Sequence, residues 1–171
     1  AASDVYKRQG FNIVLSSPSG AGKTTITKKI SQKYPNIKIS ISHTTRKPRP
    51  NEIEGKDYYF VSESEFKNLI DENKFLEYAK VFQNYYGSSK DVVFKKLNKA
   101  ENVIFDIDWQ GTEQIKKQKL NYRILTIFIW PPSRDELYKR LLNRDRNDEK
   151  IVKERMAQFN EDVKHWKDYD F

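Results

Sequence analysis

Short apolar runs separated by segments of helical periodicity set the architecture that we expect for this chain. Apolar residues dominate positions 11–15, 103–108 and 123–130, and such runs are typical of strands that are buried on both faces. Residues 37–41 alternate isoleucine with polar side chains and predict a half-buried strand. Helices are expected between and after these strands, at residues 25–32, at 91–99, from 133 and from about 151. Strands that alternate with helices indicate an α/β fold with a parallel sheet.

The middle of the chain has the pattern of a small insert between pieces of this core. Residues 43–55 contain prolines, a glycine and two arginines and predict a loop, and residues 57–61 predict a strand. Residues 62–65 form a capping box that starts a helix. A second capping box, at residues 133–136, starts a basic helix, and a break is expected at 147–150.

The composition narrows the class of protein. The length of 171 residues favours one domain, although only 37% of the residues are hydrophobic. The longest apolar stretch, 124–130, is too short to cross a bilayer, and no charged-then-apolar signal segment opens the chain. Because the chain has no cysteine, it has no disulfide and no thiolate zinc site, and the cytoplasm is the expected location. Residues 1–10 lack periodicity and are expected to be a disordered or non-native leader.

The charge points to a phosphate-bearing partner, either a nucleotide or a nucleic acid. Lys and Arg number 32 against 24 Asp and Glu, which gives a net charge of +8. Scattered helical lysines are explained by solvated helix faces, so the arginines are more informative. Arg46 and Arg49 lie in the predicted loop, whereas Arg140, Arg144 and Arg155 follow the second capping box. Since Arg140 and Arg144 are four residues apart, they share one face of a helix.

Residues 17–24, Ser-Pro-Ser-Gly-Ala-Gly-Lys-Thr, follow the first strand and have the pattern of a phosphate cradle. The glycines allow backbone N–H groups to turn toward one anion, Lys23 adds a cation, and the Thr24 hydroxyl is placed to ligate Mg²⁺. The helix that follows directs its positive end to the same point. Ser17 stands where the pattern has glycine. A glycine-rich turn without a chemical role is the alternative interpretation.

Two carboxylates, Asp106 and Asp108, end the strand predicted at 103–108. Ligands of parallel α/β sheets gather at the carboxyl ends of the strands, so both residues are expected at the same edge as the cradle. Asp106 has the usual position of a carboxylate that acts on Mg²⁺, often through water. An aspartate that caps a helix or forms a salt bridge is the alternative for Asp106.

Several motifs in the chain resemble those of the guanylate kinase family, whose members pass the terminal phosphate of ATP to GMP. They lie at residues 16–24, 42–49, 55–60, 75–79, 84–88 and 106–111. The most specific are Thr-Thr-Arg-x-Pro-Arg, Gly-Lys-Asp-Tyr and Asn-Tyr-Tyr-Gly-Ser. The resemblance runs from about Gly10 to Phe171. It implies a P-loop three-layer α/β fold with a parallel central sheet, an inserted mixed GMP-binding domain and a helical lid.

The resemblance also implies a division of the chain. The P-loop core would comprise residues 11–37, 92–132 and 156–171, with the GMP-binding insert at 38–91 and the lid at 133–155. The family continues past Phe171 into a further strand and a terminal helix, so we expect this chain to lack them and to lose stability and ATP selectivity. Trp130 stands where the family often has a small residue.

Roles of individual residues follow from the same resemblance. ATP would bind to Ser19, Gly20, Ala21, Gly22, Lys23, Thr24, Thr25 and Arg140. The GMP phosphate would bind to Arg46, Arg49, Tyr58 and Tyr86, and guanine to Ser42, Glu77, Ser88 and Asp108. The catalytic residues would be Lys23, Arg46, Arg144 and Arg155. The ligands of Mg²⁺ would be Thr24 and Asp106, with Asp106 binding directly or through water.

The chemistry of guanine agrees with a carboxylate such as Glu77. Guanine presents N1–H and its 2-amino group side by side, and one ionised carboxylate can accept from both. Adenine has no such pair of donors and would leave the carboxylate unsatisfied. An exposed charge is the alternative for Glu77, and ordinary packing is the alternative for Tyr58 and Tyr86.

The expected partners are ATP and GMP, with no nucleic acid, no membrane and no obligate protein partner. A catalytically inactive scaffold of the same fold that binds phosphoprotein is an alternative, but Lys23, Thr24 and the intact Gly-Ala-Gly argue against it. A nucleic-acid binder would account for the charge of +8. The chain has no recognised motif that reads RNA or DNA and no dense basic tract, which argues against that function.

Overall fold

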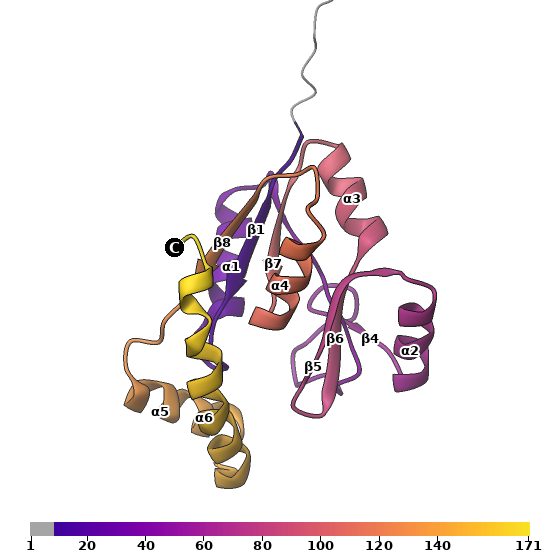
Figure 1. Cartoon of the computed structure of the whole chain (residues 1–171). Helices are drawn as coiled ribbons and strands as arrows, with labels where there is room; N and C mark the ends of the chain where they lie inside the picture. Colours follow the sequence, from indigo (N-terminus) through magenta and orange to yellow (C-terminus); the bar gives the residue numbers. More distant parts are fainter. Residues whose placement is uncertain (1–8) are drawn as a thin grey trace, which may run out of the picture.

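The computed structural model describes residues 9–171, which fold into two sheets and the helices that cover them (Figure 1). The larger sheet is parallel throughout and has the strand order β2-β7-β1-β8. Its strands are β1 (Asn12–Ser16), β2 (Ile37–Ile39), β7 (Asn102–Asp106) and β8 (Ile124–Phe128). The helices are α1 (Lys23–Lys33), α2 (Glu63–Asp71), α3 (Lys90–Asn98), α4 (Trp109–Lys117), α5 (Arg134–Arg144), α6 (Glu149–Lys164) and the 3₁₀ helix η1 (Trp166–Asp168). The predicted α/β fold with a parallel central sheet is confirmed.

Both faces of the parallel sheet are covered because its strands are apolar on both sides. Val14 of β1 packs in a buried cluster with Leu97 of α3 and Ile115 of α4. Its neighbours Ile13 and Leu15 point to the opposite face and join a second buried cluster, against which α1 packs. Three layers result, with α1 on one face of the sheet and α3 and α4 on the other.

The second sheet is mixed and has the order β4-β3-β6-β5. Its strands are β3 (His43–Thr44), β4 (Tyr59–Phe60), β5 (Phe75–Val81) and β6 (Asn84–Ser89). Phe66 of α2 is fully buried and stacks on the rings of Phe75 and Tyr85, which fixes the helix on the β5–β6 hairpin. Sequence reasoning missed this hairpin, because its turn at Phe82 and Gln83 has none of the usual glycine or asparagine residues.

Several predicted boundaries were wrong, for local reasons. The strand at 103–108 ends at Asp106, because Asp108 caps α4 by accepting a hydrogen bond from the Gly111 N–H over 3.0 Å. The strand at 57–61 is reduced to Tyr59–Phe60. Residues 62–65 form the predicted capping box, whereas Ser133 accepts from the Glu136 N–H and the reciprocal bond that defines the box is not among the described contacts.

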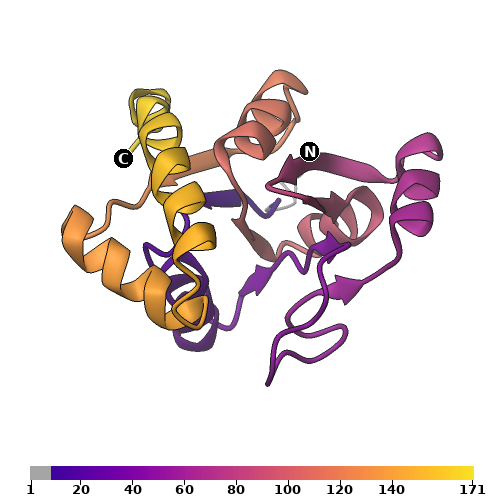
Figure 2. The ribbon, with the colours of Figure 1, turned by 90° about the horizontal axis from the view of Figure 1, so that it is seen from below.

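Helices α5 and α6 pack against each other on the side of the parallel sheet away from the second sheet (Figure 2). Leu137, Leu141 and Val152 form their buried cluster. The sequence places a break between them, and the structure shows why: Arg146 and Asn147 both have left-handed backbone, with φ of 55° and 60°. Helix α6 then passes through residues 155 and 156, the expected boundary of lid and core, without interruption.

The two ends of the described chain lie on the parallel sheet. Residues 1–8 of the expected leader are outside the described residues, but Gly10 is buried and its N–H donates to the Leu97 carbonyl over 3.3 Å. At the other end, Asp170 and Phe171 pair with Thr126 and Phe128 of β8 through backbone hydrogen bonds of 2.7 to 3.2 Å. None of the helices in residues 9–171 combines the length and apolar character needed to span a membrane.

Candidate functional site

A cavity of about 940 Å³ lies between the parallel sheet, the second sheet and helices α5 and α6. The cradle after β1 and the carboxyl end of β7 form its floor, because both strands end at the same edge of the parallel sheet. The second sheet contributes one wall, and arginines of α5 and α6 contribute the opposite wall. The cavity therefore collects side chains from segments that are far apart in the sequence.

The cradle has the backbone form that phosphate binding requires. Gly20 has φ of 87°, and a Cβ there would lie 2.8 Å from the Leu141 side chain, so only glycine fits. Gly22 precedes α1, whose first turn has no acidic residue and no side-chain cap. The first N–H groups of α1 are consequently available to an anion in the cavity.

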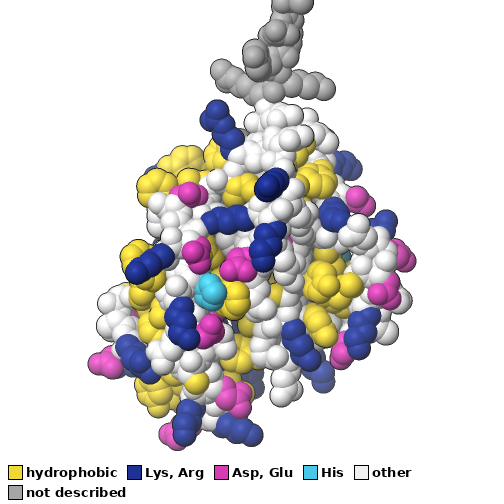
Figure 3. Space-filling model, viewed as in Figure 1, with side chains coloured by type: hydrophobic (Ala, Val, Ile, Leu, Met, Phe, Trp, Pro, Cys, Tyr) yellow, Lys and Arg dark blue, Asp and Glu magenta, His cyan; other side chains and the backbone are white. Residues whose placement is uncertain are grey.

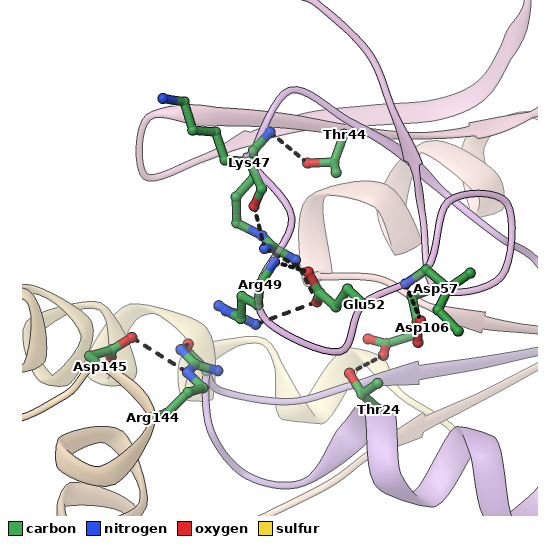
Figure 4. Close-up of polar contacts among 12 residues, drawn as sticks. Thr24, Thr44, Lys47, Arg49, Glu52, Asp57, Asp106, Arg144 and Asp145 are labelled. Atoms are coloured by element: carbon green, nitrogen blue, oxygen red, sulfur yellow. Dashed lines mark hydrogen bonds and ion pairs between the residues drawn. The ribbon is translucent and has the colours of Figure 1, made fainter.

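Asp106 joins the two polar side chains that follow these glycines. Thr24 Oγ1 donates to Asp106 Oδ2 over 2.6 Å (Figure 4), and Lys23 Nζ lies 3.1 Å from Asp106 Oδ1. Lys23 also donates to the Ile107 carbonyl over 3.1 Å. A hydroxyl and a carboxylate side by side at a phosphate cradle are hard oxygen ligands of the type that Mg²⁺ prefers, so these residues fit the metal.

Three arginines reach the cradle from the two helices on the opposite wall. Arg144 Nη2 and Arg155 Nη1 both donate to Ser19 Oγ, over 2.8 and 2.9 Å. Arg140 Nη1 donates to the Ala21 carbonyl over 3.4 Å. Burial, strengthened by the neighbouring Arg155, lowers the pKa of Arg144 to about 10, which still leaves it charged at neutral pH. The cradle thus faces a concentrated positive charge before any anion is bound.

A second pair of arginines, Arg46 and Arg49, lies in the loop of the second sheet and is organised by Glu52. Arg46 donates to both Glu52 oxygens over 2.9 and 3.0 Å, and Glu52 also accepts from the Arg49 N–H over 2.7 Å. Partial burial is the largest single effect and lowers the pKa of Arg46, but Glu52 and Tyr86 together raise it more, and the net pKa is above the ordinary value. Figure 4 shows this loop facing the cradle across the cavity.

Two tyrosines complete this second cluster. The Arg46 guanidinium lies 5.2 Å from the centre of the Tyr58 ring, and the Tyr58 and Tyr86 rings are 6.1 Å apart in an edge-to-face arrangement. Burial, with the nearby charge of Asp106, raises the pKa of Tyr58, so its hydroxyl stays protonated and can donate. The adjacent Tyr59 packs on the His43 ring and does not line the cavity, as the alternation of side chains along a strand requires.

A buried carboxylate, Glu77, closes the inner end of the cavity. Glu77 is 3% exposed and accepts a hydrogen bond of 2.6 Å from the Ser88 hydroxyl. Burial and the charge of Asp108 raise its pKa to about 7, against the opposing effect of the Ser88 hydrogen bond. Gly111 permits this approach, since a Cβ there would lie 2.4 Å from Glu77 Oε2. The site can therefore offer an acceptor for paired donors at a point shielded from water.

The structure brings nearly all of the sequence-derived candidates together. Ser88 is the exception, because it is fully buried behind Glu77 and is not part of the cavity lining. The candidates that line the cavity are Ser19, Gly20, Ala21, Gly22, Lys23, Thr24, Thr25, Ser42, Arg46, Arg49, Tyr58, Glu77, Tyr86, Asp106, Asp108, Arg140, Arg144 and Arg155.

Three carboxylates near these residues escaped sequence reasoning. Glu52 pairs with Arg46, and Asp145 pairs with Arg144 and Arg155. Asp162 of α6 lines the cavity, where burial and the charge of Asp108 raise its pKa to about 6. Nothing in the sequence distinguishes these residues from acidic residues on the protein surface. The only local signal is that Asp145 directly follows Arg144.

The fold and the cavity define a P-loop nucleotide-binding protein with a second anion-binding cluster opposite the cradle, which is the arrangement of a nucleotide phosphotransferase. The family model described as guanylate kinase matches residues 9–171, and the chain belongs to the guanylate kinase family. It is 44% identical over 164 residues to a guanylate kinase of Cereibacter sphaeroides, covering 96% of this chain and 78% of the relative. It is 46% identical over 166 residues to a guanylate kinase of Rickettsia prowazekii, covering 97% and 83%.

A solved structure supports the same assignment. The crystal structure of guanylate kinase from Anaplasma phagocytophilum matches with a TM-score of 0.75 and 33% identity, covering 96% of this chain and 76% of that chain. The expected family, fold and activity are confirmed, and the chain is a transferase that phosphorylates GMP at the expense of ATP.

The inactive-scaffold alternative gains no support. The cradle retains Lys23 and Thr24 in contact with Asp106, which an inactive scaffold would not need. On the face shown in Figure 3, Lys and Arg side chains are spread among acidic ones and form no continuous basic track.

Proposed function

We propose that the cavity holds ATP and GMP with their phosphates facing each other and that the surrounding residues carry the γ-phosphoryl group from ATP to GMP or dGMP. The observation that carries this proposal is the convergence of the cradle and two separate arginine clusters on one cavity. Two anionic nucleotides repel each other, so a site that joins them must supply positive charge from both sides.

The ATP phosphates are assigned to the cradle side. Backbone N–H groups at the start of α1 and the Lys23 ammonium would bind the outer phosphates, with Arg140 closing from α5. The residues of this group are Ser19, Gly20, Ala21, Gly22, Lys23, Thr24, Thr25 and Arg140. All of them except Arg140 belong to the continuous segment 19–25, which runs from the loop into α1, whereas Arg140 reaches it from α5.

GMP is assigned to the second sheet. Hydrogen bonds to Glu52 and to the Lys47 carbonyl use three of the five N–H groups of Arg46, which leaves Nε–H and one Nη2–H on the same edge as a fork for phosphate. Arg49, Tyr58 and Tyr86 would complete the phosphate site. Guanine would lie against Glu77, with Ser42 and Asp108 beside it and Ser88 holding Glu77 in place.

Phosphoryl transfer would depend on alignment and charge rather than on a protein nucleophile. Lys23, Arg46, Arg144 and Arg155 come from opposite walls and would surround the transferred group. In related phosphotransferases one such arginine is worth about 10³ to 10⁵ in rate. Thr24 and, through water, Asp106 would hold Mg²⁺, which neutralises charge on the ATP phosphates.

The division into a P-loop core, a GMP-binding insert and a lid is part of this proposal. The parallel sheet extends to Ile39, two residues into the segment assigned to the insert. Closure of the lid over both nucleotides would exclude water from the reaction. No protein partner is required for these steps, and a cytoplasmic location agrees with a role in purine metabolism.

A coupled assay that measures ADP tests the proposal. The protein is given ATP and Mg²⁺ with GMP, dGMP, AMP or UMP in parallel, and Lys23→Ala serves as the matched control. We expect ADP production with GMP and dGMP alone, and its loss in the control. Binding of GMP without turnover in the parent would favour the scaffold function instead.

A further inference from the structure

Asp145 lies behind the two arginines that face the cradle from α5 and α6. It is the first residue after α5, and its side chain is 8% exposed. Its Oδ2 lies 2.9 Å from Arg155 Nε, and its Oδ1 lies 3.7 Å from Arg144 Nε. One buried carboxylate therefore serves two guanidinium groups that come from different helices, and Figure 4 shows its pairing with Arg144.

The two guanidinium groups are oriented in the same way. In each, Nε lies within ion-pair distance of an Asp145 carboxylate oxygen without forming a hydrogen bond to it, and an Nη atom donates to the single hydroxyl oxygen of Ser19. Asp145 and Ser19 thus lie at opposite ends of both arginines. The Ser19 hydroxyl belongs to the cradle, so the Nη ends are directed to the place where phosphate oxygens are expected.

Without a counter-charge this arrangement would be unstable. Burial and the charge of the other arginine both lower the pKa of Arg144, and burial also lowers the pKa of Arg155. Both effects disfavour two charged guanidinium groups that are held close together away from water. The negative charge of Asp145 offsets part of this unfavourable energy. A further contact, between the Arg155 guanidinium and the Phe82 ring at 4.9 Å, restrains only one of the two side chains.

We propose that Asp145 is a positioning residue that holds Arg144 and Arg155 with their Nη ends toward the cradle before the phosphates arrive. This inference rests on the roles proposed above for the two arginines. When the transferred phosphoryl group develops charge, the Nη ends can leave Ser19 and bind it, while the Nε ends remain on Asp145. The arginines then need little reorganisation during transfer, which is the condition for efficient electrostatic catalysis.

This role predicts an effect on kcat rather than on the KM for GMP. Among the hydrogen bonds and ion pairs of residues 9–171, none joins the Asp145 side chain to a residue assigned to guanine or to the GMP phosphate. Loss of Asp145 would leave two like charges free to separate, and small displacements of groups that act on the transferred phosphoryl can cost about 100-fold in rate. The affinity of the GMP site should remain unchanged.

The variant Asp145→Asn tests the inference, with Asp148→Asn as the matched control. Asp148 is exposed, lies in the same connection, and caps α6 by accepting from the Lys150 and Ile151 N–H groups. Both substitutions remove one negative charge. For Asp145→Asn we expect kcat to fall about 10- to 100-fold with the KM for GMP within about twofold; for Asp148→Asn we expect wild-type kcat. Wild-type kcat in a folded Asp145→Asn variant would overturn the inference.

A second measurement separates this inference from the proposed function. In the Arg155→Lys background, Asp145→Asn should cost less than in the parent, because one of the two guanidinium groups that it positions is already gone. Fully additive losses would contradict the positioning role. If Arg155→Lys itself keeps wild-type kcat, the proposed role of Arg155 fails; if it is impaired while Asp145→Asn is not, only the role of Asp145 fails. If Asp145→Asn does not fold, Asp145→Glu takes its place, with a reduced kcat expected and an unchanged kcat contradicting the inference.

Discussion

The hydroxyl of Ser88 donates a 2.6 Å hydrogen bond to Glu77 Oε1, and both residues are buried, Glu77 in the wall of the cavity and Ser88 behind it. Burial and the charge of Asp108 favour the neutral acid, whereas this hydrogen bond favours the carboxylate. The pKa of Glu77 is raised to about 7 as a result. The residue assigned to guanine therefore changes its ionisation state near neutral pH.

We predict that GMP binding weakens as the pH falls below about 7. The ionised form of Glu77 is the one that accepts from N1–H and the 2-amino group, so kcat/KM for GMP should fall by about fivefold between pH 7 and pH 6. The second ionisation of the GMP phosphate, with a pKa of about 6, contributes to the same limb. Direct binding measurements on Glu77→Gln separate the two, since only the phosphate limb should remain. Identical pH profiles in parent and variant would contradict the prediction.

A second prediction concerns stability in the absence of nucleotide. The folded-state pKa of Glu77 is raised from 4.5 to about 7, so the folded state binds a proton that the unfolded state releases. The stability from this proton is complete below about pH 4.5 and is lost as the pH rises through about 7. The full shift corresponds to about 3 kcal/mol as an upper limit. We expect Glu77→Gln to unfold at a higher temperature than the parent at pH 8.

Thermal unfolding at pH 5 and pH 8 checks this prediction. The difference between Glu77→Gln and the parent should be about 1–3 kcal/mol at pH 8 and small at pH 5. Saturating GMP should reverse the order at pH 8, because the ligand stabilises the form that binds it. A parent that is more stable than Glu77→Gln at pH 8 without GMP would show that the buried carboxylate carries no such cost.

A third prediction concerns Glu52, which orients Arg46. Glu52→Gln keeps the size of the side chain but loses the charge that holds two guanidinium N–H groups. Hydrogen bonds to charged groups are worth about 1.5–3 kcal/mol, so we expect the KM for GMP to rise about 10- to 100-fold with a smaller change in kcat. Glu54→Gln is the control, since the Glu54 carboxylate accepts from the Phe60 N–H. A lower KM in Glu52→Gln would mean that Glu52 competes with the phosphate.

The parallel core and the cradle could be predicted because their signals are local. A buried strand needs only a short apolar run, and Gly-Lys-Thr after such a run places a cation and a hydroxyl beside turned N–H groups. Asp108 was assigned to the strand because the buried Ile107 extends the apolar run. The chain instead turns at this point into α4, and the signal was the capping geometry of Asp108, which a hydrophobic pattern does not record.

Glu52 and Asp145 could not be predicted because their roles depend on tertiary neighbours. Glu52 meets Arg46 through the fold of one loop, and Asp145 meets Arg155 only when α5 and α6 pack. The β5–β6 hairpin was missed for a different reason: Phe82 takes left-handed backbone with φ of 56° in place of a glycine. Its ring contacts Arg155, so the unusual turn residue coincides with a contact to the proposed machinery.

A fourth prediction concerns the metal. Asp106→Asn should raise the Mg²⁺ concentration needed for half-maximal rate about 10- to 100-fold, because Asp106 would act on the metal through water. Thr24→Ser keeps the hydroxyl and serves as the control. Rates measured over a range of Mg²⁺ at fixed ATP and GMP give the result. An unchanged Mg²⁺ dependence with a lower kcat would assign Asp106 to its 3.1 Å ion pair with Lys23 instead.

The last prediction concerns Ser17, which stands where the cradle pattern has glycine. Within residues 17–24 the left-handed residues are Gly20 and Gly22, so the backbone at Ser17 does not require glycine. Ser17 is 9% exposed, and its hydroxyl donates to the Pro18 carbonyl over 2.9 Å. Ser17→Gly should therefore leave kcat/KM within about twofold and lower the stability by about 0.4–1 kcal/mol, chiefly by increasing the entropy of the unfolded chain.

Gly20→Ala provides the contrast at a position where the backbone does require glycine. Its φ is 87°, and the added Cβ would meet Leu141 at 2.8 Å, so we expect a loss of about 1–3 kcal/mol. Chemical denaturation of the three proteins and the coupled assay give both quantities. A severalfold higher kcat/KM for ATP in Ser17→Gly would show that the serine side chain obstructs the nucleotide, which would make this departure from the pattern a functional one.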